Sequence, residues 1–272
     1  MALARSAPPL TAAALKRALG PDHARFSLRV LERCASTNAD LLAAPAPSAH
    51  DTTIAVCLAH EQTAGRGRRG RTWHAWPGHS LTFSCLFPWS SGAPAASGLT
   101  LTAGLALVET LEAFGLVGSA LKWPNDVLVE GRKIAGILVE QSGVGSEKQR
   151  IVIGIGLNLH LPDTAQDELA AATALDRHLQ PMPAPAELVA ATLRQLARRC
   201  EAYRAHGLTA IHPAWMQRHA FNGRAVRILD EGRTLLEGEC VGIDLEGALL
   251  VQRANGARER VFSGELSLRA AL

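Results

Sequence analysis

The sequence predicts an α+β fold, with a mixed or antiparallel sheet flanked by helices and a small C-terminal β-barrel of the SH3 kind. Hydrophobic residues make up 47% of the 272 residues and charged residues 19%, which is enough apolar surface for a sizeable core. The strand-like segments come in clusters rather than alternating with helices. After residue 221 the chain changes to short alternating runs divided by turn signals.

The first part of the chain holds short elements. Residues 11–19 have a helical pattern. A second helix is expected to begin at Ser36, Thr37 and Asn38, because each of these residues is a good N-cap. Strands are expected over 25–33, 52–59 and 80–87.

The middle of the chain holds the clearest helix, followed by a run of strands. Leu101, Leu105, Val108 and Leu111 recur at helical spacing within 97–115. Four strands are expected after this helix, over 118–123, 126–130, 134–141 and 150–159. Further helices are expected over 185–206 and near 208–219.

The last part of the chain has the sequence pattern of a small all-β unit. It contains the runs AVRIL, TLLEGECVGI, ALLVQ, ERVF and LSLR, separated by turn signals such as Glu246-Gly247 and Asn255-Gly256. Five short strands in so short a segment are typical of a small barrel. We therefore expect two domains, 1–220 and 221–272.

Charge and cysteine usage limit the function classes. Lys and Arg number 28 and Asp and Glu 25, and a net charge of +3 does not predict a general nucleic-acid or membrane binder. The five cysteines are odd in number and widely spaced with no C-x-x-C, so the sequence suggests neither a disulfide framework nor a zinc site. No apolar run reaches membrane-spanning length, and Lys16 and Arg17 argue against a secretory signal. The sequence predicts a soluble protein of the reducing cytoplasm, without a membrane partner.

An arginine-rich loop, Gly65-Arg66-Gly67-Arg68-Arg69-Gly70-Arg71, is the strongest single feature. No Asp or Glu occurs between Gln62 and Val108, so this charge has no acidic neighbour in the sequence. Glycines let the backbone approach a ligand, and guanidinium groups suit phosphate and carboxylate oxygens. A solvated basic loop or a nonspecific nucleic-acid contact is the alternative. The formal match to G-x-G-x-x-G is rejected, because no helical pattern opens after it.

A second motif combines a stiff turn with scarce lysines. Lys122-Trp123-Pro124-Asn125-Asp126 holds an amide and a carboxylate at a turn between strands, and Lys133 opens the next apolar strand. The chain has only four lysines, and two of them lie here. The alternative is a hairpin with ordinary surface charges.

Glycines inside a predicted strand mark a third motif, Gly154-Ile155-Gly156-Leu157-Asn158. Such glycines weaken a strand, and one usual reason is the close approach of another group. A bulge or a bend over a helix is equally compatible with this motif. Ser36-Thr37-Asn38 by itself indicates a helix cap.

Together these motifs occur in a recognisable order. With Ser36-Thr37-Asn38, GRGRRGRTW, KWPND, GRKIAGIL and GIGLN, the chain closely resembles the biotin protein ligases over roughly residues 30–269. The resemblance implies a catalytic domain like that of class II aminoacyl-tRNA synthetases and lipoate ligases. It also implies that ATP and biotin are joined to biotinyl-5′-adenylate, with Mg²⁺. The biotinyl group would then pass to a lysine of a biotin carboxyl carrier protein.

The resemblance implies site residues by matching motif positions. Biotin would contact Ser36, Thr37, Asn38, Gln62, Arg66, Gly67, Arg68, Lys133, Gly136 and Gly154. ATP and the adenylate would contact Arg66, Arg68, Arg71, Trp73, Lys122, Asn125, Lys133 and Asn158. Trp73 would be the adenine platform and Asn158 the group at the adenine edge, while Gly136 and Gly154 would leave room for the ligand.

The reaction assigns catalytic roles to three residues. A carboxylate attacking the α-phosphate brings two anions together, so cations and Mg²⁺ must offset their repulsion. Arg68 and Lys133 are the expected catalytic cations, acting more on the transition state than on ground-state binding. Asp126 is the candidate proton acceptor for the carrier lysine, although it also suits an Mg²⁺ contact or a brace for the turn. No metal ligands are assigned.

Departures from the family bear on the partners. Many relatives carry an N-terminal winged helix and bind DNA, whereas about 30 residues precede the first motif here, so we expect no DNA binding. A homodimer is compatible with the resemblance, and the sequence leaves the oligomeric state open. The alternatives are a lipoate or octanoate ligase, a nucleic-acid-binding protein that uses the arginine-rich loop, and an SH3-like adaptor. The paired motifs favour biotin, and an aromatic content of 4% disfavours stacking on nucleic acid.

Overall fold

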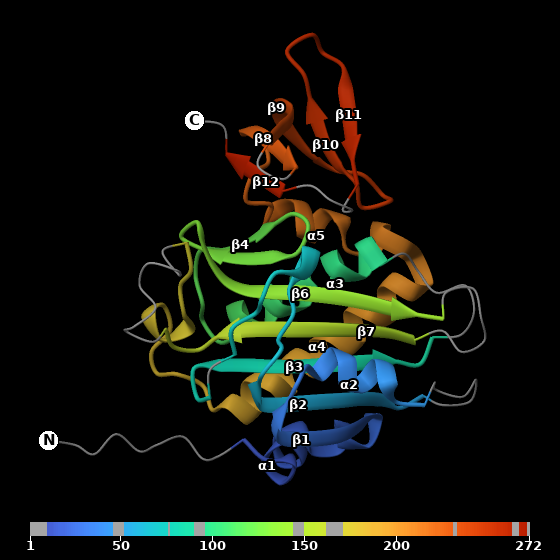
Figure 1. Ribbon diagram of the computed structural model, residues 1–272, viewed down its shortest axis with the longest axis vertical. Helices are drawn as coiled ribbons and strands as arrows, with labels where there is room; N and C mark the ends of the chain where they lie inside the picture. Colours follow the sequence, from blue (N-terminus) through green and yellow to red (C-terminus); the bar gives the residue numbers. More distant parts are fainter. Residues whose placement is uncertain are drawn as a thin grey trace, which may run out of the picture.

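A seven-stranded sheet forms the main body of the protein (Figure 1). The computed structural model describes residues 10–45, 52–75, 77–89, 96–143, 150–161, 171–230, 233–262 and 267–270. The strand order is β1-β2-β3-β7-β6-β5-β4. The strands are β1 (Phe26–Cys34), β2 (Ile54–Gln62), β3 (Ser80–Phe87), β4 (Ser119–Lys122), β5 (Asp126–Val129), β6 (Arg132–Ser142) and β7 (Arg150–Asn158).

One parallel pair makes this sheet mixed. β1 and β2 are parallel, whereas the other neighbours pair antiparallel. A parallel pair needs a crossover, and α2 (Thr37–Ala43) lies within the connection between its strands. Figure 1 shows α2 on one face of the sheet and α3 (Ala96–Ala113) and α4 (Pro185–His206) on the other. The site described below lies on the α2 face.

The helix α3 is apolar almost all round, because it lies between the sheet and α4. Leu99, Leu105 and Leu111 are fully buried in this layer. The remaining N-terminal helix, α1 (Ala12–Leu19), begins at the N-cap Thr11 and packs on α4. These helices make the back of the sheet rigid, so the opposite face can carry a site on fixed strands.

A second sheet of five antiparallel strands follows, in the order β11-β10-β9-β8-β12. The connection to it is the short helix α5 (His212–Gln217). The strands are β8 (Ala225–Asp230), β9 (Arg233–Ile243), β10 (Leu249–Gln252), β11 (Arg258–Val261) and β12 (Ser267–Ala270). This sheet lies beside the β4 edge of the main sheet, where the Trp123 indole Nε1 donates to the carbonyl of Gly247 at 3.1 Å (Figure 1).

The predicted fold class is confirmed, and most predicted elements agree with the structure to within a few residues. The predicted helix near 208–219 differs, because a 3₁₀ turn at Gly207–Ala210 precedes α5. Pro213 lacks an N–H and restricts the residue before it, so a new helix starts at His212. The domain boundary near residue 221 stays a prediction. In the described part of the chain, none of the helices combines the length and the hydropathy that crossing a bilayer requires.

Candidate active site

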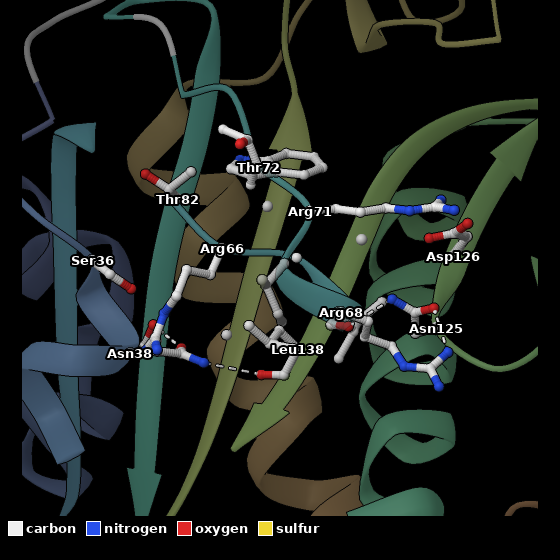
Figure 2. A pocket seen from close by; sticks show the side chains of 18 of the residues that line it. Ser36, Asn38, Arg66, Arg68, Arg71, Thr72, Thr82, Asn125, Asp126 and Leu138 are labelled. Atoms are coloured by element: carbon white, nitrogen blue, oxygen red, sulfur yellow. Dashed lines mark hydrogen bonds between the residues drawn. The ribbon is translucent and has the colours of Figure 1, made fainter. Parts of the chain in front are cut away.

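A pocket on the α2 face of the main sheet brings the three sequence motifs together (Figure 2). It is lined by residues of α2, the arginine-rich loop, the β4–β5 turn and strands β3, β6 and β7. Its cationic side chains are Arg66, Arg68, Arg69, Arg71, Lys122 and Lys133. Among the described lining residues, Asp126 supplies the one carboxylate. Such a pocket favours a ligand with several negative charges.

At α2 and β3 the pocket is lined by neutral polar side chains, with the ion pair of Arg66 and Glu140 beside them. Thr37 donates its backbone N–H to Gln62 Oε1 at 2.8 Å, and its hydroxyl lies 2.6 Å from Ser84 Oγ. Asn38 accepts from Ser84 Oγ at 2.6 Å and donates to Glu140 Oε2 at 2.7 Å. Thr37, Asn38 and Ser84 are buried. A preorganised set of donors and acceptors in an enclosed place suits a small polar head group.

The arginine-rich loop folds as a tight hairpin over the pocket. Gly67 N–H donates to the Arg71 carbonyl at 2.7 Å, and Trp73 N–H donates to the Gly65 carbonyl at 2.9 Å. A Cβ on Gly65 would lie 2.4 Å from the Trp73 carbonyl oxygen, so this close approach requires glycine.

Two arginines connect this loop to the main sheet. Arg66 Nη2 lies 3.1 Å from Glu140 Oε1 of β6. Arg68 Nη1 lies 3.4 Å from Asn125 Oδ1 in the β4–β5 turn (Figure 2). Burial lowers the pKa of the Arg68 guanidinium, and the neighbouring charges of Arg69 and Arg71 act in the same direction. The cost of a buried cation is smaller when an anion is bound beside it.

Lys133 reaches the same pocket from the sheet. Its Nζ lies 2.6 Å from Asp126 Oδ1 and 5.7 Å from the centroid of the Trp73 ring. The register of β5 and β6 shifts between the pairs Val127↔Ala135 and Leu128↔Lys133. Such a bulge re-aims side chains, and here Ile134 is fully buried in the core while Lys133 lines the pocket.

The glycines of β6 and β7 make room for protein side chains. A Cβ on Gly154 would lie 2.3 Å from Asn38 Oδ1, and one on Gly156 would lie 2.3 Å from Trp73 Cε2. A Cβ on Gly136 would lie 3.1 Å from Lys133 Nζ. Gly136 and Gly154 line the pocket with Lys133 and Asn38 close beside them, and the role of these glycines in leaving room for the ligand stays a prediction.

Asn158 is placed differently from the other predicted site residues. Apart from Asn158, all of them line the pocket, including Lys122, Arg71 and Gln62. The Asn158 side-chain amide donates to the Thr173 carbonyl at 3.0 Å and is buried. It holds the segment from residue 171, whose Ala171 carbonyl and Thr173 N–H both bond the Lys133 backbone at 2.8 Å. The structure therefore gives Asn158 a positioning contact.

Sequence reasoning missed Thr82, Ser84 and Glu140. Thr82 and Ser84 face the pocket from β3, and Glu140 holds Asn38 and Arg66. Gly156 belongs to the third sequence motif, and the group that comes close to it is the Trp73 indole. The signal for Thr82 and Ser84 was present, because two polar residues spaced by two interrupt an apolar strand. Glu140 had no local signal, since its partners lie far away in the sequence.

The donor set can be compared with the needs of Mg²⁺. Within the described residues, no three His, Cys, Asp or Glu side chains gather to hold a metal ion. Mg²⁺ often needs only one or two carboxylates, because substrate phosphates supply its other oxygen ligands. Asp126 fits that requirement, with the Asn125 amide beside it. These residues fit Mg²⁺ that arrives with ATP.

Comparisons with known proteins agree with this geometry. Residues 30–158, which include every residue lining the pocket, match the biotin/lipoate A/B protein ligase family. Residues 221–269 match the biotin protein ligase C-terminal domain.

Relatives and solved structures show the same similarity. The biotin–[acetyl-CoA-carboxylase] ligase of Paracoccus denitrificans is 38% identical over 246 residues, which is 86% of this chain and 100% of that protein. The bifunctional ligase/repressor BirA of Escherichia coli is 34% identical over 79% of this chain and 67% of that protein. A biotin protein ligase from Aquifex aeolicus, solved in complex with biotin and ATP, has a TM-score of 0.74 and 26% identity over 91% of this chain and 99% of that chain. The agreement over catalytic and C-terminal regions alike means that the chain belongs to the biotin protein ligase family.

Proposed function

We propose that this ligase couples biotin to ATP in this pocket and then biotinylates a lysine of a carboxyl carrier protein. The observation that carries the proposal is a single pocket that joins neutral polar side chains of α2 and β3 to a cluster of arginine and lysine side chains. Biotin presents a polar head group at one end and a carboxylate at the other. Placed along the pocket, it brings its carboxylate to the cations that would also bind the phosphates of ATP.

In the first half-reaction a carboxylate oxygen of biotin bonds to the α-phosphorus, and pyrophosphate leaves with the electron pair of the broken P–O bond. Arg68 and Lys133 are the proposed catalytic cations, since they reach the same pocket from separate segments of the chain. Fixed positive charges aimed at developing negative charge lower the barrier most in a site that excludes water. Mg²⁺ bound with ATP would add charge neutralisation, with Asp126 and Asn125 as its protein ligands.

In the second half-reaction the carrier lysine attacks the acyl carbon, and AMP leaves. A free lysine amine has a pKa near 10.4, so at pH 7 its deprotonation costs roughly 4.6 kcal/mol. The cations of the pocket would favour the neutral amine, and Asp126 is the proposed acceptor of the proton. Trp73 is the proposed adenine platform, because its indole lines the pocket and lies close to Gly136 of β6 and Gly156 of β7.

Two further elements belong to this proposal. The carrier would be part of a biotin-dependent carboxylase, as the names of the Paracoccus denitrificans and Mycobacterium tuberculosis relatives state for those proteins. A location in the cytoplasm is supported by the five cysteines, all of which are unpaired.

The arrangement of the loop disfavours the nucleic-acid alternative. Arg66 pairs with Glu140, and Arg68 contacts Asn125, so these arginines are directed onto the protein's own pocket. A stripe that binds nucleic acid would direct them outward, along a surface with stacking aromatics.

Mass measurement of a carrier domain after incubation with ATP, Mg²⁺ and biotin tests the proposal. We expect a gain of one biotinyl group per carrier and the release of pyrophosphate and AMP. Omission of ATP and replacement of biotin by lipoate are the controls. Modification with lipoate, or no modification with biotin, would contradict the proposed substrate.

A further inference from the structure

An ion pair joins the arginine-rich loop to the second sheet. Arg69 Nη2 contacts Asp230 Oδ1, and Asp230 is the last residue of β8. The two residues are 161 positions apart, and their side chains are only 26% and 31% exposed. Arg69 lines the pocket, whereas Asp230 lies outside it. The contact therefore ties the arginine-rich loop, which lies over the pocket of the main sheet, to the second sheet.

The backbone conformation of Arg69 is unfavourable by itself, so contacts with the rest of the protein must hold it. Arg69 has φ 60° and ψ 33°, which is left-handed backbone that L side chains rarely adopt. Gly70 follows with φ 70°. Such a conformation persists only where the surroundings hold it, and the Asp230 carboxylate is the contact that meets the displaced guanidinium.

Charge gives the contact a second reason. The loop has four arginines and no acidic residue of its own. Each anchoring carboxylate or amide comes from elsewhere: Glu140 for Arg66, Asn125 for Arg68 and Asp230 for Arg69. Three anchors on three different elements determine where so short a segment lies. Removal of one leaves the loop free to move about the other two.

We propose that Asp230 is a positioning residue for the ligation, holding the loop closed over the pocket through Arg69. The proposal rests on the proposed function, since what the closed loop retains is the biotinyl-adenylate formed between the two steps. Asp230 does not line the pocket and touches no reacting atom. The second sheet thus sets the rate at which the intermediate escapes.

Asp230→Asn tests the proposal, with Glu259→Gln as the matched control. Glu259 Oε1 lies 3.0 Å from Arg253 Nε on the same sheet, and neither residue lines the pocket. We expect Asp230→Asn to speed the dissociation of preformed biotinyl-adenylate by about tenfold. In Asp230→Asn the KM for ATP should rise by a larger factor than kcat falls. Glu259→Gln should have the wild-type dissociation rate, KM and kcat.

Further measurements separate positioning from a general loss of stability. Asp230→Glu should restore slow dissociation, because it keeps the charge. Arg69→Ala should release biotinyl-adenylate as fast as Asp230→Asn does, and the double variant should release it no faster than either single variant. Because salt weakens an ion pair that is partly exposed to solvent, the difference in dissociation rate between wild type and Asp230→Asn should shrink at high ionic strength. The thermal midpoint should not change.

Some outcomes overturn this inference alone. One is a wild-type rate of adenylate dissociation in Asp230→Asn. Another is an equal increase of this rate in Glu259→Gln. The third is additive effects of Arg69→Ala and Asp230→Asn on this rate. A wild-type protein that forms no adenylate from biotin and ATP would instead refute the proposed function. The two failures are therefore distinguishable in one set of assays.

Discussion

Lys133 is the proposed catalytic cation whose position depends most directly on local backbone geometry. The bulge in β6 directs it from the sheet into the pocket, where its ammonium lies between Asp126 and the Trp73 ring. A fixed ammonium at this point needs no reorganisation when negative charge develops on the phosphate and carboxylate oxygens. Its scarcity in the sequence, one of four lysines, was the signal that singled it out.

Lys133→Gln should reduce kcat/KM for adenylate formation by about 100-fold or more, the effect of removing one preorganised charge-stabilising group. Pyrophosphate release measures this rate. Lys16→Gln on α1 is the matched control, because Lys16 lies on a helix outside the pocket. A change of only a few-fold in Lys133→Gln would remove Lys133 from the catalytic set.

Gly154→Ala should weaken biotin binding, because the new methyl group would displace Asn38 and break its bonds to Ser84 and Glu140. The strain should cost about 1–3 kcal/mol of unfolding free energy. Calorimetric titration with biotin and denaturant unfolding measure the two effects. In the Asn38→Ala background the stability loss should disappear while binding stays weak. An unchanged biotin affinity in Gly154→Ala would contradict this role of Asn38.

At the scale of elements, the β4–β5 turn is held from both sides. Asn125 donates to the Ile137 carbonyl of β6 at 3.0 Å, and Trp123 bonds Gly247 of the second sheet. Trp123 is 1% exposed although its motif lies on a turn. The turn that carries Lys122 and Asp126 is therefore positioned by packing rather than by its own hydrogen bonds alone.

Trp123→Phe should destabilise the protein by about 1–3 kcal/mol, because the buried Gly247 carbonyl loses its donor. Denaturant unfolding measures this loss. Trp89→Phe makes the same chemical change where a half-buried ring stacks on Phe87, and it should cost less. Equal losses in the two variants would mean that the Trp123 hydrogen bond contributes little.

At the scale of the whole molecule, the two sheets meet around a buried histidine. His219 lies 4.7 Å, ring to ring, from Trp215 of α5, and both of its ring nitrogens are 3.9 Å from the Cys240 thiol of β9. Its backbone forms a bridge with Leu121 of β4. Burial lowers the pKa of His219 to about 4 and raises that of Cys240 to about 11, so both groups are neutral in the folded protein at pH 7.

The free energy of unfolding should therefore decrease as the pH falls from about 6.5 to about 4. In this window the unfolded chain binds a proton at His219 that the folded chain does not, and the loss should approach about 3 kcal/mol. Denaturant unfolding at a series of pH values measures this slope. His219→Phe should flatten the slope between these limits. An unchanged slope in that variant would place the acid sensitivity elsewhere.

Local pattern predicted much of this site. The arginine-rich loop, the KWPND turn and the GIGLN strand were each visible because their residue types are unusual for the element that carries them. The groups that approach the glycines were not visible in the sequence. A Cβ on Gly154 would collide with Asn38 and one on Gly156 with Trp73, and the positions of these two side chains depend on the fold. Glu140 and Asp230 were missed for the same reason.

The sequence by itself determined the order of helices and strands, the fold class and the chemical character of the pocket, because periodicity, caps and residue type are local properties. Only the tertiary structure decided which charges meet. The partners of Asn38 and Arg69 lie 102 and 161 positions away, and a carboxylate at such a distance looks like any surface charge until packing places it. Convergence of distant segments depends on the whole packed core, and no short window of the chain contains that information.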